Sequence, residues 1–273
     1  MQTVAILCLL ALSCFASPVL QQQAASGSAS IAYAVDVDWT VPSSAFECVR
    51  QSHYNVAFIQ GYSGYSQGMV NQYAISNIKN ANSEGLGTEV YMELQPKSSK
   101  TGAQQLDEMY GTLRNANINI RSVWVQVTDP MPNYWYSNTT LNINFLNSIF
   151  YRARQYGLSI GIYTSANEWS QITGNATISN AMLWYWSTTG GGTAYESPAN
   201  FDDFRPFGGW TTPSVKQFGR VEMVCGVPAN KNIYAVSGAE KFTGMVKYKK
   251  SEPIFVGSLG LGTVAAGRAE IKK

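Results

Sequence analysis

The sequence predicts an α/β protein, an irregular TIM-like β/α barrel whose last part is mostly β. Strand-like and helix-like segments alternate along most of the chain at a spacing of roughly thirty residues, which is typical of βαβ units and a parallel sheet. After Thr164 the helix-like segments become rare and the strand-like segments lie closer together. The 273 residues are 45% hydrophobic, so one large domain can bury a sizeable core.

The strands are predicted from short alternating or apolar runs. The pattern is clearest in residues 122–128, where valines alternate with Trp124, Gln126 and Thr128. Asp129-Pro130 then ends the strand, because proline cannot donate to a strand ladder. Gln126 and Thr128 thus share one face at the C-terminal end of a strand, where α/β barrels carry their chemistry. The expected strands are residues 31–38, 56–62, 88–94, 122–128, 158–164, 182–187 and 215–219.

Helices are expected between these strands. Pro42-Ser43-Ser44 and Gly102-Ala103 have the composition of helix starts. Gly85 and Gly157 suit helix ends, because glycine readily adopts the left-handed conformation that follows a last helical turn. The expected helices are residues 43–52, 70–82, 102–115 and 141–156.

The N-terminal segment has the pattern of a secretory signal. Val4 to Phe15 is a short apolar run, and Ala16-Ser17-Pro18 follows it, so residues 1–16 are predicted to be a signal peptide cut near Ala16. The run is too short to span a bilayer. Residues 17–30 are rich in Gln, Ala, Ser and Gly and are expected to be a flexible leader. The barrel domain is then expected at residues 31–234 of a secreted, extracellular protein.

Two cysteines remain after the signal, Cys48 and Cys225. Closing a barrel brings its first and last strands together, so a disulfide between them is the simplest interpretation in an oxidising compartment. Two separate free thiols are the alternative. Asn138-Thr139-Thr140 and Asn175-Ala176-Thr177 are glycosylation acceptor sequences, which have a function only in a secreted chain.

The chain changes character at residue 235. Residues 235–273 carry seven basic against three acidic side chains, and their apolar part is interrupted by glycine and too short for a membrane span. We interpret this segment as an appended basic, disordered extension.

Composition excludes several classes of partner and site. Only 13% of residues are charged and the net charge is +2, which gives no electrostatic reason to expect nucleic acid. The single histidine, His53, cannot supply a histidine-based metal site or a catalytic triad by itself. We expect no membrane span and a monomer.

Acidic side chains at strand ends are the candidates for chemistry. Glycoside hydrolysis needs two carboxyl groups roughly 5–9.5 Å apart across a cleft. Asp36 and Asp38 lie two residues apart on one expected strand and so face one side. Glu93 ends another strand and Asp129 lies just past a third. Each could instead be a solvated loop residue.

Aromatic side chains at strand ends could bind sugars. Tyr and Trp are plentiful, with 16 and 7 residues, and their rings are flat surfaces on which sugar rings can stack. Trp184 and Trp186 end an expected strand and Tyr91 lies near the end of another, so these rings could line a sugar subsite. Packing inside the core is the alternative for each of them.

Several segments together resemble glycoside hydrolase family 25, in its invertebrate and protist-type lysozyme branch. The resemblance covers residues 33–234 and implies a β/α barrel, secretion, peptidoglycan as the glycan partner, a role in antibacterial innate immunity, and no metal or organic cofactor. The segments that carry it, in chain order, are Tyr33-Ala34-Val35-Asp36-Val37-Asp38, Gly161-Ile162-Tyr163-Thr164, Leu183-Trp184-Tyr185, Phe207-Gly208-Gly209-Trp210 and Cys225-Gly226.

The chain departs from that family at its catalytic positions. The resemblance places a catalytic Asp at Asp36, which is present, and an Asp-x-Glu pair on the central strand, where this chain has Gln126 and Thr128. A further Asp near the last strand corresponds to Asn230. Amide and hydroxyl groups hydrogen-bond sugars but cannot act as a general acid near neutral pH. The expectation is a saccharide cleft without the inherited mechanism, in which these three side chains bind the glycan.

Three functions remain open from the sequence. The first is a lysozyme-like immune protein that binds glycan strands with little or no hydrolysis. The second is a working lysozyme whose acid has moved to Asp129, Asp38 or Glu93. Asp129 is the neighbour of Thr128, so strand alternation counts against it unless a bulge at Pro130 turns it inward. The third is a signalling or lectin-like protein whose basic tail contacts a partner.

Overall fold

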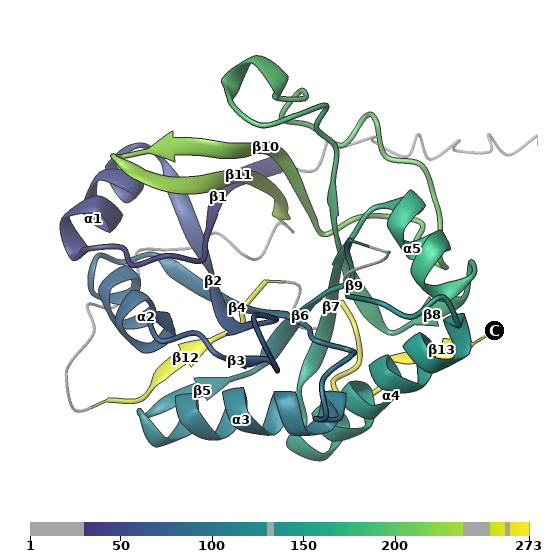
Figure 1. Cartoon of the computed structure of the whole chain (residues 1–273). Helices are drawn as coiled ribbons and strands as arrows, with labels where there is room; N and C mark the ends of the chain where they lie inside the picture. Colours follow the sequence, from purple (N-terminus) through teal and green to yellow (C-terminus); the bar gives the residue numbers. More distant parts are fainter. Residues whose placement is uncertain (1–29, 130–133, 237–251, 260–262, 273) are drawn as a thin grey trace, which may run out of the picture.

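The computed structural model describes residues 30–129, 134–236, 252–259 and 263–272. Eight strands close into a barrel, because β1 pairs with β2 on one side and with β11 on the other (Figure 1). The α/β barrel expected from the sequence is confirmed. In their order around the barrel the strands are β1 (Ser30–Val37), β2 (Tyr54–Ser63), β4 (Gly87–Glu93), β6 (Ser122–Gln126), β7 (Ser159–Thr164), β9 (Ala181–Trp186), β10 (Val215–Val224) and β11 (Val227–Val236).

The barrel is irregular at β11. The pairings from β1 through β2, β4, β6, β7 and β9 to β10 are parallel, whereas β11 is antiparallel to both of its neighbours. A tight turn at Cys225-Gly226 joins β10 to β11, and a two-residue connection of this kind can only join antiparallel strands. The last repeat therefore has no helix, in agreement with an end that is mostly β.

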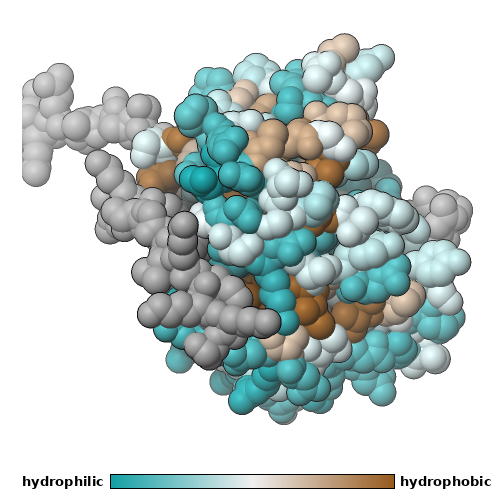
Figure 2. All heavy atoms as spheres, turned by 90° about the vertical axis from the view of Figure 1, so that its left-hand side faces the viewer, coloured by the Kyte–Doolittle hydropathy of each residue, from teal (hydrophilic) through white to brown (hydrophobic). Residues whose placement is uncertain are grey.

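Five α-helices of the described residues surround the barrel (Figure 1). Local sequence explains their ends: Thr101 and Gln104 form a capping box before α3, and Gly157 follows α4 with φ 68°. The side of the molecule that carries α1 and α2 is mainly hydrophilic, with apolar residues only in small patches (Figure 2). The helices are α1 (Ser43–Gln51), α2 (Ala74–Ser83), α3 (Gly102–Asn115), α4 (Thr139–Tyr156) and α5 (Ala166–Thr173).

Aromatic side chains fill the inside of the barrel. Trp184 lies at the centre, with its ring centroid 4.4 Å from those of Phe58 and Tyr163 and 6.0 Å from that of Trp124. Gly161 makes room for Trp124, since a Cβ at residue 161 would collide with the indole ring. The interior is thus a packed core, and a ligand can enter only at an end.

Several elements were missed by the sequence analysis. Most are too short to show a periodicity: β3 (Met69–Val70), β5 (Ile118–Ile120), β8 (Thr177–Ser179) and the 3-10 helix η1 (Thr193–Tyr195). The missed helix α5 has only eight residues. Strand β11 is long, but its charged and amide side chains concealed it.

The C-terminal segment differs from the disordered extension that we expected. In its described part, β12 (Ile254–Val256) pairs in parallel with β5, and β13 (Glu270–Lys272) pairs antiparallel with β8. Leu259 is 3% exposed and belongs to the apolar cluster inside the barrel. Residues 254–259, part of the yellow segment in Figure 1, therefore cover the end of the barrel opposite the carboxyl ends of the parallel strands, whereas β13 lies outside, beside α4. The sequence did not predict these strands, because the segment is rich in glycine and each strand has only three residues. Such short strands are ordered by the strands with which they pair.

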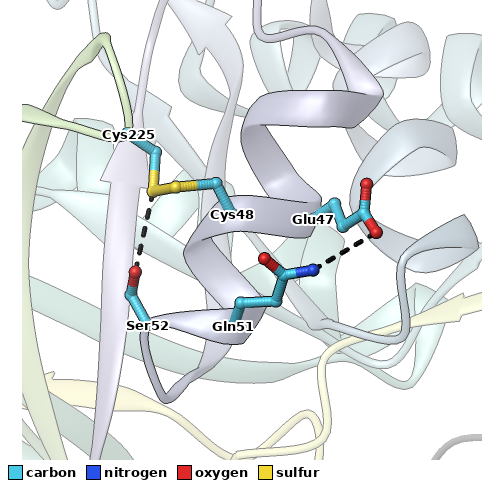
Figure 3. Close-up of a disulfide and its surroundings, with 5 residues drawn as sticks. All are labelled: Glu47, Cys48, Gln51, Ser52 and Cys225. Carbon is cyan, nitrogen blue, oxygen red and sulfur yellow. Dashed lines mark hydrogen bonds between the residues drawn. A yellow bond between two sulfur atoms is a disulfide. The ribbon is translucent and has the colours of Figure 1, made fainter.

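The expected disulfide is confirmed. Cys48 of α1 and Cys225 of the β10–β11 turn are bonded, with Cα atoms 5.8 Å apart at a sequence separation of 177 (Figure 3). The bond fastens the tip of the β10–β11 hairpin to the outer helix layer. The side chains of both predicted glycosylation sites, Asn138 and Asn175, are exposed.

Some sequence predictions fall outside the described residues. They are the signal peptide at residues 1–16, the leader except for Ser30, and Pro130. No helix in the described ranges is long and apolar enough to cross a membrane. In the same ranges, no group of three or more His, Cys, Asp or Glu side chains is arranged to hold a metal ion.

Candidate active site

A cavity of about 210 Å³ opens at the C-terminal ends of the parallel strands. We call it the central cavity. Nearly all of its lining side chains are polar, and they come from every barrel strand, from the loops that follow the strands and, for Glu168, from α5. The lining residues are Asp36, Asp38, Gln60, Tyr91, Glu93, Gln126, Thr128, Asp129, Tyr163, Glu168, Trp184, Trp186, Gln217, Arg220 and Asn230. Every catalytic and substrate-binding candidate from the sequence is among them, although this placement does not test their roles.

Asp36 is held by three amide side chains. Near the end of β1 it is 5% exposed and points into the barrel. Asn230 donates to Asp36 Oδ1 at 2.7 Å, while Gln217 and Asn232 donate to Oδ2 at 2.9 and 2.8 Å. All three donors come from the β10–β11 hairpin. The carboxylate is therefore oriented rigidly at the floor of the cavity.

Burial raises the pKa of Asp36, and the nearby charge of Asp38 adds to the rise, whereas the three amide hydrogen bonds oppose it. Hydrogen bonds to a carboxylate favour its charged form. The amides thus compensate in part for the removal of Asp36 from water, without bringing a neutralising cation next to it.

The central strand presents neutral groups to the cavity. Gln126 ends β6, and its Nε2 donates to Thr128 Oγ1 at 3.0 Å. The backbone beyond the strand is fixed, since the carbonyl of Thr128 accepts from Trp135 Nε1 and that of Val127 accepts from Thr164 Oγ1. Gln126 and Thr128 therefore face the cavity as period-2 alternation predicts, and both are occupied in a mutual hydrogen bond.

Asp129 also faces the cavity, which corrects the expectation from strand alternation. β6 ends at Gln126, and Asp129 has a left-handed backbone with φ 56°, so alternation no longer applies. Thr128 Oγ1 donates to Asp129 Oδ2 at 3.3 Å, and the backbone N–H of Asp129 donates to Glu168 Oε1 at 3.1 Å. A carboxylate thus lies beside Thr128, at one end of the neutral pair.

Glu93 is the second acidic residue at a strand end that is largely buried. Its Oε2 accepts from Gln60 Nε2 at 3.3 Å, from Ser63 Oγ at 3.4 Å and from the backbone N–H of Gly64 at 3.2 Å. Burial raises the pKa of Glu93, and the negative charges of Asp129 and Asp38 raise it further. A carboxyl group with a raised pKa is better able to hold a proton at neutral pH.

The aromatic candidates divide into floor and rim. Trp184 is 1% exposed, and its Nε1 donates to Asn232 Oδ1, so it forms the packed floor and offers no exposed ring face to a sugar. Tyr91 is 6% exposed and packs edge-on against Trp184. Trp186 lies at the rim, where its Nε1 donates to Glu168 Oε2 at 2.6 Å and Arg220 lies 5.1 Å from its ring centroid.

Sequence analysis missed several polar residues of the site, among them Glu168, Gln217 and Asn232. Glu168 is at the third position of α5, where Ser165 caps the helix, and the Ser-x-x-Glu spacing is a recognisable helix start. Asn232 lies on the same face of β11 as Asn230 and Tyr234, because residues two apart on a strand share a face. No local sequence pattern identifies Gln217, because its contribution is a hydrogen bond to Asp36, which lies far away in the sequence.

The comparisons with known proteins agree with this geometry. Residues 27–218 match the model of the family described as Lysozyme-like protein 1. Lysozyme-like protein 1 of Caenorhabditis elegans is 49% identical over 213 residues, which are 77% of this chain and 71% of that protein. Probable GH family 25 lysozyme 2 of Dictyostelium discoideum is 33% identical over 202 residues, covering 73% of this chain and 89% of that protein.

Solved structures share the fold at low sequence identity. A bacterial lysozyme from Streptomyces coelicolor superposes with a TM-score of 0.59 at 19% identity, covering 77% of this chain and 95% of the other. A family GH25 lysozyme from Aspergillus fumigatus gives a TM-score of 0.55 at 15% identity, covering 79% and 100%. These likenesses concern the fold alone, while the sequence matches confirm the resemblance noted above. The chain therefore belongs to the lysozyme-like protein 1 family, within the glycoside hydrolase family 25 lysozymes.

Proposed function

We propose that this protein is secreted, binds bacterial peptidoglycan in its central cavity as part of innate immune defence, and hydrolyses it weakly or not at all. One observation carries the proposal. Gln126 and Thr128, two neutral side chains bonded to each other, line the same cavity as the retained carboxylate of Asp36.

The chemistry of the two groups separates binding from turnover. Glycoside hydrolysis needs a proton donor for the leaving oxygen as well as a carboxylate beside the sugar ring. Asp36 can supply the carboxylate, but neither an amide nor a hydroxyl donates a proton as an acid near neutral pH. Losing the general acid costs about 10²–10⁴ in rate. Hydrogen bonds from Gln126, Thr128 and Asn230 to sugar hydroxyls do not depend on that proton, so affinity is less affected.

Two features support secretion. The apolar segment at residues 4–15 precedes a small-residue sequence typical of signal cleavage. The bonded pair Cys48 and Cys225 is of the kind that persists in oxidising compartments. Extracellular peptidoglycan and an antibacterial role follow from that location and from the names of the lysozyme-like relatives.

The test pairs a binding assay with a clearing assay. The unmutated protein is incubated with insoluble peptidoglycan and sedimented, and in parallel the turbidity of a bacterial wall suspension is followed. We expect co-sedimentation together with clearing at least about 10²-fold slower than that by an equal amount of an active lysozyme. Fast clearing would contradict the loss of activity, and absence from the pellet would contradict binding.

A working lysozyme that uses Glu93 as its acid is the second candidate. Among the acidic residues considered from the sequence as relocated acids, Glu93 combines a place in the central cavity with a pKa raised by burial. If it protonates the leaving oxygen, the unmutated protein clears walls and Glu93→Gln abolishes clearing while leaving sedimentation with peptidoglycan intact. Asp129→Asn tests the neighbouring carboxyl group, and it should lower clearing only in part, because the negative charge of Asp129 contributes to the raised pKa of Glu93.

A further inference from the structure

A second hollow adjoins the central cavity on the side of Asp38 and Glu93. It has a volume of about 460 Å³ and lies between the end of β1, the β2–β3 hairpin and the start of α2. Asp38, Gln60 and Glu93 line both hollows, so the two form one continuous surface. We call the second hollow the outer groove.

Exposed aromatic rings and one exposed methionine gather in the outer groove. Trp39 is 57% exposed, Tyr65 is 75% exposed and Met69 is 49% exposed. The rings of Trp39 and Tyr73 lie together with their centroids 5.4 Å apart. Single exposed apolar side chains are ordinary, but a cluster in a hollow beside a polar cavity indicates a binding surface. Flat rings of this kind suit the apolar face of a sugar.

The backbone under Trp39 is fixed although its ring is exposed. Asn77 Nδ2 donates to the carbonyl of Trp39 at 2.7 Å, and its Oδ1 accepts from the N–H of Val41 at 3.0 Å. Asn71 Nδ2 donates to the carbonyl of Asp38 at 2.8 Å. The main chain that carries the indole is thus fixed, which limits the ordering needed when a ligand stacks on the ring.

The charges of the outer groove narrow the choice of ligand. Its ionisable lining side chains are the two carboxylic acids Asp38 and Glu93 and two tyrosines, and no basic side chain among the described residues lines it. Phosphates, anionic lipids and the carboxylate-bearing peptide stems of a cell wall are therefore poor partners. An uncharged sugar, with apolar ring faces and hydroxyl and amide groups, matches the rings and the neighbouring amides of Asn71 and Gln60.

We propose that the outer groove is a saccharide subsite, in which an N-acetylglucosamine unit of the strand bound in the central cavity stacks on Trp39. The inference rests on the proposed function and extends it, because it assigns the protein a preference for longer glycan strands. The central cavity, at about 210 Å³, is too small for several sugars, whereas the two hollows together accommodate more of the strand.

Calorimetric titration with two probes tests the subsite. The probes are the disaccharide and the tetrasaccharide of alternating N-acetylglucosamine and N-acetylmuramic acid, without peptide stems and with their lactyl carboxyl groups amidated so that they carry no charge. We expect Trp39→Ala to weaken tetrasaccharide binding about tenfold, since one ring face is lost, and to leave disaccharide binding unchanged. Trp39→Phe should recover much of the loss. Tyr151→Ala is the matched control, because Tyr151 is an aromatic residue of α4 with 65% exposure that lines neither hollow.

The outcomes separate this subsite from the proposed function. If the unmutated protein binds the tetrasaccharide and Trp39→Ala binds it equally well, the subsite is refuted and the proposed function stands. Equal weakening of both probes also refutes it, since Trp39 would then act through the central cavity. If the unmutated protein binds neither probe nor insoluble peptidoglycan, the proposed function fails and the subsite fails with it.

Discussion

The two ends of the barrel each hold a buried carboxylate, but the groups that hydrogen-bond it differ between the two ends. Asp36 lies at the mouth and Glu89 lies at the opposite end, near the start of β4. Both point into the barrel, and among the described residues neither forms a salt bridge. Burial raises the pKa of both groups, and hydrogen bonds to neutral donors oppose the rise in both.

The donors come from different parts of the chain. Asp36 is bonded by amide side chains of β10 and β11, which leave the cavity beside it open. Glu89 is bonded by Ser122 Oγ at 3.2 Å and Trp124 Nε1 at 2.9 Å, and by the backbone N–H groups of Ser258 and Leu259 at 2.6 and 2.9 Å. The C-terminal segment thus covers Glu89 completely, and its exposure is 0%.

This difference makes one end of the barrel a candidate binding site and the other end a closed, packed surface. At the mouth, side chains satisfy the carboxylate from within the barrel wall, and the approach of a ligand is not obstructed. At the other end, backbone from a distant segment satisfies it and excludes water at the same time. A buried carboxylate costs several kcal/mol unless it is bonded, so each set of donors is needed for stability, but only the set around Asp36 leaves room for function.

Removing the C-terminal segment should produce the largest effect. In a chain that ends at Val236, Glu89 loses two backbone donors and the apolar surface under Ile254, Val256 and Leu259 is uncovered. We expect the free energy of unfolding to fall by roughly 5 kcal/mol or more. Urea denaturation followed by circular dichroism measures it. A chain that ends at Val264 is the control, because it keeps the donors to Glu89 and should lose far less.

Restoring charge at the mouth should change catalysis rather than stability. The double change Gln126→Asp with Thr128→Glu supplies a carboxylate and a proton donor beside Asp36. We expect it to raise the rate of wall clearing by about 10²–10⁴, which is about 3–5 kcal/mol in the barrier. Gln126→Asp alone supplies no acid at residue 128 and should gain little. Robust clearing by the unmutated protein, abolished by Glu93→Gln or Asp129→Asn, would instead establish a relocated acid.

Opening the disulfide should weaken the mouth more than the closed end. The disulfide between Cys48 and Cys225 (Figure 3) fastens the β10–β11 hairpin. This hairpin supplies all three amide donors to Asp36. We expect Cys48→Ser with Cys225→Ser to lower the free energy of unfolding by roughly 2–4 kcal/mol. Hydrogen exchange should show the loss of protection in β10 and β11. Equal loss in β5 and β12 would mean that the bond stabilises the barrel as a whole.

The smallest effect concerns pH. Burial raises the pKa of Glu89, so the folded protein binds this proton more tightly than the unfolded chain does. The stability that this group contributes is therefore full at low pH and is lost as pH rises through the raised pKa. Glu89→Gln should remove this decline. Between the ordinary pKa of a glutamate and the raised pKa of Glu89, the free energy of unfolding of the variant should rise relative to that of the unmutated protein by up to about 1.4 kcal/mol per pH unit. Parallel stability curves would contradict the assignment.

The parts of the site that the sequence predicted are those that follow from local pattern. Period-2 alternation placed Gln126 and Thr128 on one face, and the structure has both in the central cavity. The same rule failed at Asp129, where the backbone turns left-handed after the strand has ended. No pattern in the sequence favours Trp184 or Trp186 as the ring on which a sugar stacks. Only the tertiary contacts show that Trp184 is packed in the floor of the central cavity and that Trp186 lies at its rim.

The sequence by itself determined the barrel class, the facing of its central strand, and which two cysteines could pair. Each depends on composition, on the spacing within a segment, or on the order of segments along the chain. Tertiary structure alone decided what surrounds the two carboxylates, because the bonds of Asp36 to Gln217 and of Glu89 to Leu259 span 181 and 170 residues. No local pattern encodes such pairs. They form only when the barrel closes, which brings its first strand beside its last, and when the C-terminal segment covers the end that holds Glu89.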